Sequence, residues 1–167
     1  DAIGLSASGT LSLAGVQDTT TPANQYIGLE ISSLNASLIG ITGLTFDVSG
    51  AKVQVNQGPV GGRLNWSAAT VTDATHDPDG ILPAFTMTSA VEFAASGDVA
   101  LDAFGFVVGV GSFDLSKQSL TVNDDTIADF DADVLAVTVT VTDLFVGVGG
   151  SLSGGSIDKT GAIGVSA

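Results

Sequence analysis

The sequence contains no cysteine and few cationic side chains. Without cysteine, the chain has neither a disulfide framework nor thiol chemistry. Four Lys and Arg residues stand against 18 Asp and Glu residues, which gives a formal net charge of −14. A nucleic-acid-binding surface needs a basic face, so this balance excludes nucleic acid as a partner and disfavours anionic membrane surfaces.

Long apolar runs and glutamate are also scarce. The nearest approach to a membrane span, residues 103–113, is short and interrupted by glycine, whereas a spanning helix needs about 20 apolar residues. No membrane insertion is therefore predicted. Only Glu30 and Glu92 are glutamates, and the other acidic residues are aspartates. Aspartate favours turns, helix caps and cation sites over helix interiors.

Small and β-branched residues with 22 glycines make up much of what is present. Segments such as "LTFDV", "KVQVN" and "VLAVTVTVTDL" alternate apolar and polar residues with the period of a β-strand. We predict an all-β fold, a β-solenoid-like stack of short strands with Gly, Ser and Asn at its corners. The alternative is an elongated antiparallel β-sandwich with hairpins at residues 49–52 and 116–119.

The sequence repeats itself at two scales. Residues 2–7 match residues 162–167 at every position except Leu5, which corresponds to Val165. Residues 34–56 also align without gaps to residues 101–123. We therefore predict that residues 1–160 are one tandem repeat unit and that residues 161–167 begin the next unit.

A long polar segment, residues 57–83, interrupts the strand pattern and predicts a loop. Trp66 beside Arg63 is a candidate patch for stacking on a sugar, and the alternative is a Trp that anchors the loop. Asp77 and Asp79 in "DPDG" resemble half of a calcium loop. The alternative for these two aspartates is a turn held by side-chain to backbone hydrogen bonds.

A second acidic segment, residues 123–134, carries five aspartates. These candidate Ca²⁺ ligands are Asp124, Asp125, Asp129, Asp131 and Asp133. If residues 129–133 are extended, three of the carboxylates share one face, where a cation or solvent must screen them. A structural, oxygen-ligated calcium ion is one interpretation, and a solvated acidic edge that blocks strand pairing is the other.

Catalytic signatures are not evident. His76 is the single histidine, so a zinc site built on a His pair is excluded, and the sequence has no Gly-x-Ser-x-Gly elbow. The glycine-rich stretches lack the lysine and the spacing of a phosphate-binding loop. We predict that the protein is not an enzyme.

Three segments, "SLIGITGLTFDVSGAKVQVNQ", "LFVGVGGSL" and "TGAIGVSA", resemble the tandem β-repeats of very large bacterial surface or secreted, adhesin-like proteins. The resemblance implies a bacterial extracellular or cell-surface location and often stabilisation by calcium. We expect a non-catalytic structural module of a long fibre or adhesin stalk that packs end to end with neighbouring copies of the same repeat. The alternative is a glycan-binding β module that uses the 57–83 loop to hold surface glycans.

Overall fold

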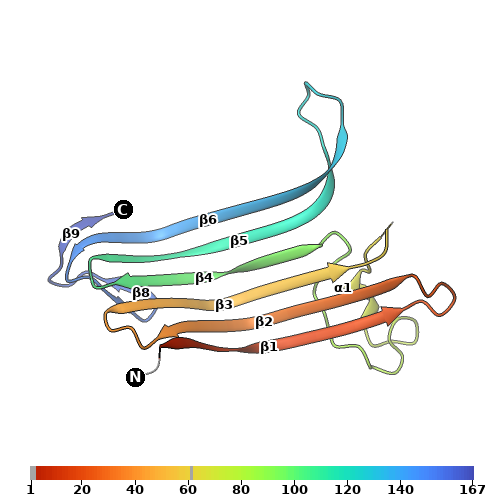
Figure 1. Cartoon of the computed structure of the whole chain (residues 1–167), viewed down its shortest axis with the longest axis horizontal. Coiled ribbons are helices and arrows are strands. Elements are labelled where there is room, and N and C mark those ends of the chain that lie inside the picture. The colour runs from red at the N-terminus through yellow and green to blue at the C-terminus, as the bar shows by residue number, and fades with distance from the viewer. Residues whose placement is uncertain (1–2, 61) are drawn as a thin grey trace.

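The described part of the protein is built around one large antiparallel sheet. The computed structural model describes residues 3–60 and 62–167, so Ala2, the first residue of the matching stretch, lies outside the described part. Seven strands form the sheet in the order β1-β2-β3-β4-β5-β6-β9 (Figure 1). They are β1 (Gly4–Gln17), β2 (Gln25–Ile39), β3 (Leu44–Gln57), β4 (Phe93–Ala103), β5 (Val107–Val122), β6 (Phe130–Val148) and β9 (Ile163–Ser166). The predicted all-β class is confirmed.

Each main strand pairs with its neighbour in the sequence, so the sheet is a meander. A separate hairpin, β7 (Ser151–Ser153) with β8 (Ser156–Asp158), lies between β6 and β9 in the chain. The β5–β6 hairpin extends beyond the other strands and bends away from them (Figure 1). Within the described ranges, this hairpin-by-hairpin order contains neither stacked solenoid coils nor a second large sheet that would complete a sandwich.

The strands are long, whereas the sequence predicted short ones. The six strands β1–β6 have 11 to 19 residues each. The hairpins predicted at 49–52 and 116–119 are wrong, because both segments lie inside continuous strands. Gly50 has a φ of 59° and lies where the β3–β4 register shifts between Ser49 and Lys52. The glycine therefore accommodates a bulge, which keeps the strand running instead of turning it.

Strand pairing gives the sheet one apolar and one polar face. Adjacent partners in an antiparallel sheet point to the same side, so each row of partners defines a face. One row of partners runs Leu11, Ile31, Val53, Ala95, Leu115 and Val137. The next row runs Ser12, Glu30, Gln54, Ala94, Ser116 and Ala136. We call the side of the first row the open face and the side of the second row the covered face.

The internal repeat of residues 34–56 and 101–123 is visible in the fold. Each copy forms the end of one strand, a turn and the following long strand, in β2–β3 and again in β4–β5. Phe46 and Phe113 are equivalent in the alignment. Phe46 pairs with Leu101, Phe113 pairs with Gly97, and both phenylalanines lie on the open face. The repeat therefore preserves the side of the sheet to which equivalent residues point.

The core lies where the segment between β3 and β4, residues 58–92, packs on the covered face. Its centre is Trp66, which has no exposed surface and begins the short helix α1 (Trp66–Ala69). The core cluster consists of Ala14, Trp66, Phe85 and Met87, with Val16, Tyr26, Leu64, Leu82 and Val91 packed around it. The Trp66 indole donates a 3.0 Å hydrogen bond to Oδ1 of Asn56, which is itself fully buried. This bond satisfies the polar edge of the ring inside the core.

Gly28 of β2 makes room for the tryptophan and provides a test of this packing. A Cβ at residue 28 would lie 2.6 Å from the Trp66 ring, whereas a Cβ at Gly15 would meet nothing within 4 Å. We expect Gly28→Ala to lower the free energy of unfolding by about 1–3 kcal/mol through overpacking. The matched control, Gly15→Ala, should change it little. Equal denaturation midpoints for the two variants would contradict this account of the core.

Candidate functional site

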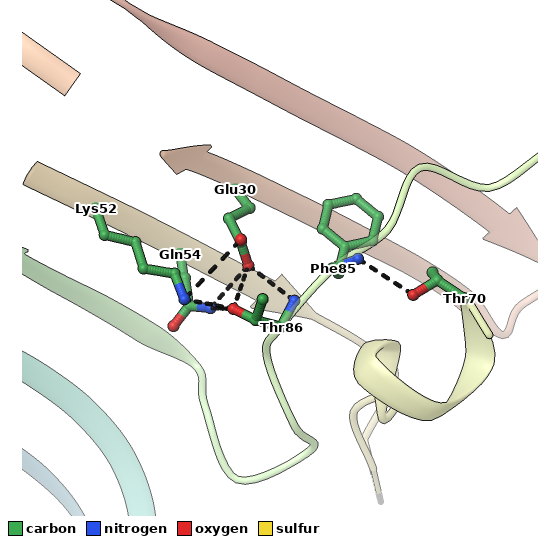
Figure 2. Close-up of polar contacts among 6 residues, drawn as sticks. All are labelled: Glu30, Lys52, Gln54, Thr70, Phe85 and Thr86. Carbon is green, nitrogen blue, oxygen red and sulfur yellow. Dashed lines mark hydrogen bonds and ion pairs between the residues drawn. The ribbon is translucent and has the colours of Figure 1, made fainter. Parts of the chain in front are cut away.

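A buried carboxylate connects the 58–92 segment to the sheet. Glu30 of β2 is 7% exposed, and its Oε2 atom accepts hydrogen bonds from Gln54 Nε2 at 2.8 Å and from the Thr86 backbone N–H at 3.1 Å (Figure 2). The Thr86 hydroxyl donates to the same oxygen at 3.0 Å. Lys52 donates to the Thr86 hydroxyl, and its ammonium lies 3.9 Å from Glu30 Oε1. No sequence motif predicted a role for these residues.

The same network determines the protonation of Glu30. Burial alone would raise the pKa of this carboxyl, because desolvation disfavours the charged form. Hydrogen bonds from Gln54 and Thr86, together with the Lys52 charge, outweigh the burial and hold the pKa of Glu30 below its ordinary value. Glu30 is therefore ionised in the folded protein and acts as an acceptor that positions the segment.

Ionisation of Glu30 should make stability depend on pH. Because the folded pKa is lowered, the contribution of Glu30 is complete above its unfolded pKa of about 4.3 and is lost as the pH falls through the folded pKa. We expect Glu30→Gln to lower the free energy of unfolding at pH 7 by about 2 kcal/mol. Denaturant unfolding should show a smaller difference from the unmodified protein at pH 3. The exposed Asp98→Asn serves as control, and a pH-independent effect of Glu30→Gln would contradict this role.

The predicted sugar-stacking pair, Arg63 and Trp66, does not form a surface patch. Trp66 is fully buried in the core, so its ring has no face available to a sugar, which corrects the prediction of this residue as a ligand contact. Its alternative role, the anchor of the loop, matches the packing. Arg63 donates from Nε to the Ser89 carbonyl at 3.1 Å and from Nη1 to Glu92 at 3.4 Å.

Arg63 lines a polar cleft between the 58–92 segment and the β5–β6 hairpin. The cleft has a volume of about 970 Å³, and its polar lining includes Asn56, Arg63, Ser89, Glu92, Ser119 and Asp133. Glu92 binds Lys117 as well as Arg63, and its hydrogen bond and charge raise the pKa of Lys117. Glu92 is thus paired with both Arg63 and Lys117, and a ligand that binds these charged groups would have to compete with the two ion pairs.

Asp77 and Asp79, the first predicted calcium ligands, lie in different environments. Asp77 is buried, and its two oxygens accept backbone hydrogen bonds from Ile81 at 3.1 Å and Leu82 at 2.9 Å. These bonds correspond to the turn that the sequence offered as the alternative. Asp79 is exposed. Nearby, the backbone N–H groups of Thr75 and His76 and the His76 ring lower the pKa of Asp73.

The second acidic segment forms a row of polar pairs. Asp124 accepts hydrogen bonds from the backbone N–H groups of Thr126 and Ile127, which lower its pKa. The following pairs then cross the hairpin: Asn123 with Asp129, Thr121 with Asp131, and Ser119 with Asp133.

Asp131 and Asp133 lie on one face of β6, and Asp125 adopts a positive φ of 66° in the turn. Across residues 3–60 and 62–167, no group of three or more His, Cys, Asp or Glu side chains is arranged to hold a metal ion. Calcium binding by either acidic segment stays a prediction.

The two matching stretches of the sequence lie at opposite edges of the sheet. β1 forms one edge, and β9, which has almost the sequence of residues 3–6, pairs with β6 at the other (Figure 1). Val165 pairs with Val146, and Leu144 and Ala167 exchange backbone hydrogen bonds of 3.1 and 3.0 Å. Lys159 donates to Asp143 at 2.8 Å and to the Ser166 hydroxyl at 2.9 Å. These contacts hold the end of the described chain on β6.

Comparison with protein families, curated proteins and solved structures gave no match. In the described part of the chain, no helix has the length and apolar character needed to span a membrane.

Proposed function

We propose that this chain is a non-catalytic structural repeat module of a long extracellular bacterial fibre or adhesin stalk, whose partners are neighbouring copies of the same repeat. The observation that carries the proposal is the position of β9. Its sequence repeats the start of β1, and it lies at the edge of the sheet opposite to β1. One unit thus presents, at its far edge, the sequence with which it begins.

The polar chemistry of the unit supports a structural role. Glu30, Arg63 and Asp77 use their polar atoms to hold the 58–92 segment in place. The alternative of a glycan-binding module has less support. Because Trp66 is buried, the candidate contacts left for a glycan are Arg63 and the other polar residues that line the cleft. The described part of the unit forms one antiparallel meander, which gives no support to the predicted β-solenoid-like stack of short strands.

A tandem protein provides the test of the structural role. We expect proteins with two and four copies of residues 1–160 to be stiff, so that their length in small-angle X-ray scattering grows in proportion to the number of copies. Copies separated by a flexible Gly/Ser linker provide the control, whose dimensions should grow more slowly. If the direct tandem and the linked control have the same dimensions, the units are independent and the structural role is wrong.

Calcium would stabilise the folded unit if either acidic segment binds it. We expect the melting temperature to rise in millimolar calcium and to fall again with a chelator. A ligand that binds only the folded state adds about 2.7 kcal/mol at a hundredfold excess over its Kd. Asp79→Asn and Asp129→Asn would show which segment is responsible. A melting temperature that is unchanged by calcium and chelator would contradict calcium binding by these aspartates.

A further inference from the structure

We propose that β1 of a second copy continues the line of β9 along β6, so that adjoining copies share one uninterrupted antiparallel sheet. This inference rests on the proposed function and specifies the joint between repeats. It assigns the interaction surface to two edges, the outer edge of β1 and the part of β6 that β9 leaves free.

The first argument is the incomplete cover of β6. β6 spans Phe130–Val148, but β9 pairs only with residues 145–148, and Ala167 extends the ladder to Leu144. In the structure as described, residues 130–143 have no strand on that side, and β1 has none on its outer side. A second copy whose residues 4–6 take the place of 164–166 would bring the rest of β1 alongside β6. The 14 residues of β1 fit within the 19 residues of β6.

The second argument is the uncharged stretch within each edge, which on β6 lies between Asp131 and Asp133 at one end and Asp143 at the other. No charged residue lies between Asp1 and Asp18 of the sequence, and none lies between Asp133 and Asp143. Both stretches are thus free of charge, although the chain has 22 charged residues in total. Neither stretch contains proline. Proteins usually protect a free edge strand with charges, proline or a short length. Two long, unprotected edges on one molecule are expected when each is covered by the other in the assembly.

The third argument is the match of apolar faces. Val165 and its partner Val146 both belong to the open face, but a constant register beyond them would place Leu11 and Leu13 of the second copy beside Thr140 and Thr138 on the covered face. The bulge at Thr142 corrects this mismatch. It already shifts the β5–β6 register by one residue between Val110 and Gly111.

The same one-residue shift against β1 brings Leu11 of the second copy beside Val139 and Leu13 beside Val137. All four residues are exposed in the isolated unit, at 62%, 66%, 60% and 59% respectively. The joint thus continues the apolar rows of the open face from one copy into the next.

A cysteine cross-link tests this register, because the chain has no native cysteine. The protein is a tandem in which residues 1–160 are followed by a complete copy of 1–167. Thr138→Cys in the first copy and Ser12→Cys in the second fall opposite each other in the proposed register. Cysteines on adjacent strands can meet the Cα separation of about 4.4–6.8 Å that a disulfide requires. We expect rapid intramolecular disulfide formation on mild oxidation, with loss of both free thiols.

The matched control combines the same Ser12→Cys with Thr142→Cys in the first copy. This threonine also lies on β6, but about 13 Å from residue 138 along the strand, and should not cross-link. Equal cross-linking of both pairs, or of neither in a folded tandem, would overturn the proposed joint. If the tandem were still stiff in solution, the structural role would stand and only the edge pairing would be wrong.

Hydrogen exchange provides a second readout that needs no substitution. In the tandem, amides of residues 134–143 in the first copy should exchange at least about tenfold more slowly than in the single unit. The reason is that the amides on the outer side of β6 would donate hydrogen bonds to β1 of the second copy. Amides of the second copy's β6 provide the internal control and should exchange as in the single unit. Equal exchange of the two β6 strands would contradict edge pairing independently of the cysteine variants.

Discussion

The strict alternation of side chains along each strand is the constraint on which the rest of this structure depends. A shift of one residue in the pairing of two strands would move a whole set of apolar side chains to the other face. The meander keeps its aliphatic rows together over six strands, and the register shifts in β2, β3 and β6 are placed so that they preserve these rows. Bulges in this protein therefore maintain the faces of the sheet as much as they shape it.

Because side chains alternate, one side of the sheet is polar. The 58–92 segment packs on part of this polar side, the covered face. Two contacts hold the segment there: the Trp66 ring packs against Gly28, and the Glu30 carboxylate accepts a hydrogen bond from the Thr86 backbone. The packing of Trp66 buries apolar surface, and the hydrogen bond to the ionised Glu30 fixes the position of the segment. Both depend on residues of β2, so this strand connects the core to the meander.

The fold class could be predicted from local sequence, because period-two alternation reports directly on strands. Strand length could not be predicted, because glycine occurs in bulges as well as in turns. The identity of Gly50 therefore did not show that the strand continues through this position. The burial of Trp66 depends on the absent side chain of Gly28, and the role of Glu30 depends on a threonine 56 residues away. The backbone-bonded turn at Asp77 and the anchoring of the loop by Trp66 were both among the interpretations that the residues themselves suggested.

The number of strands in the unit has a consequence for any array of copies joined as proposed. β9 is the sixth strand after β1 across the sheet, and this even number means that each new β1 runs in the same direction as the one before it. All 58–92 segments then lie along one rim of the ribbon and on one side of it, spaced by about 29 Å at a strand separation of about 4.8 Å. An odd number would have alternated them between two rims. The array would thus display the cleft beside Arg63 as a regular, one-sided row, a geometry in which weak contacts to a multivalent surface add up.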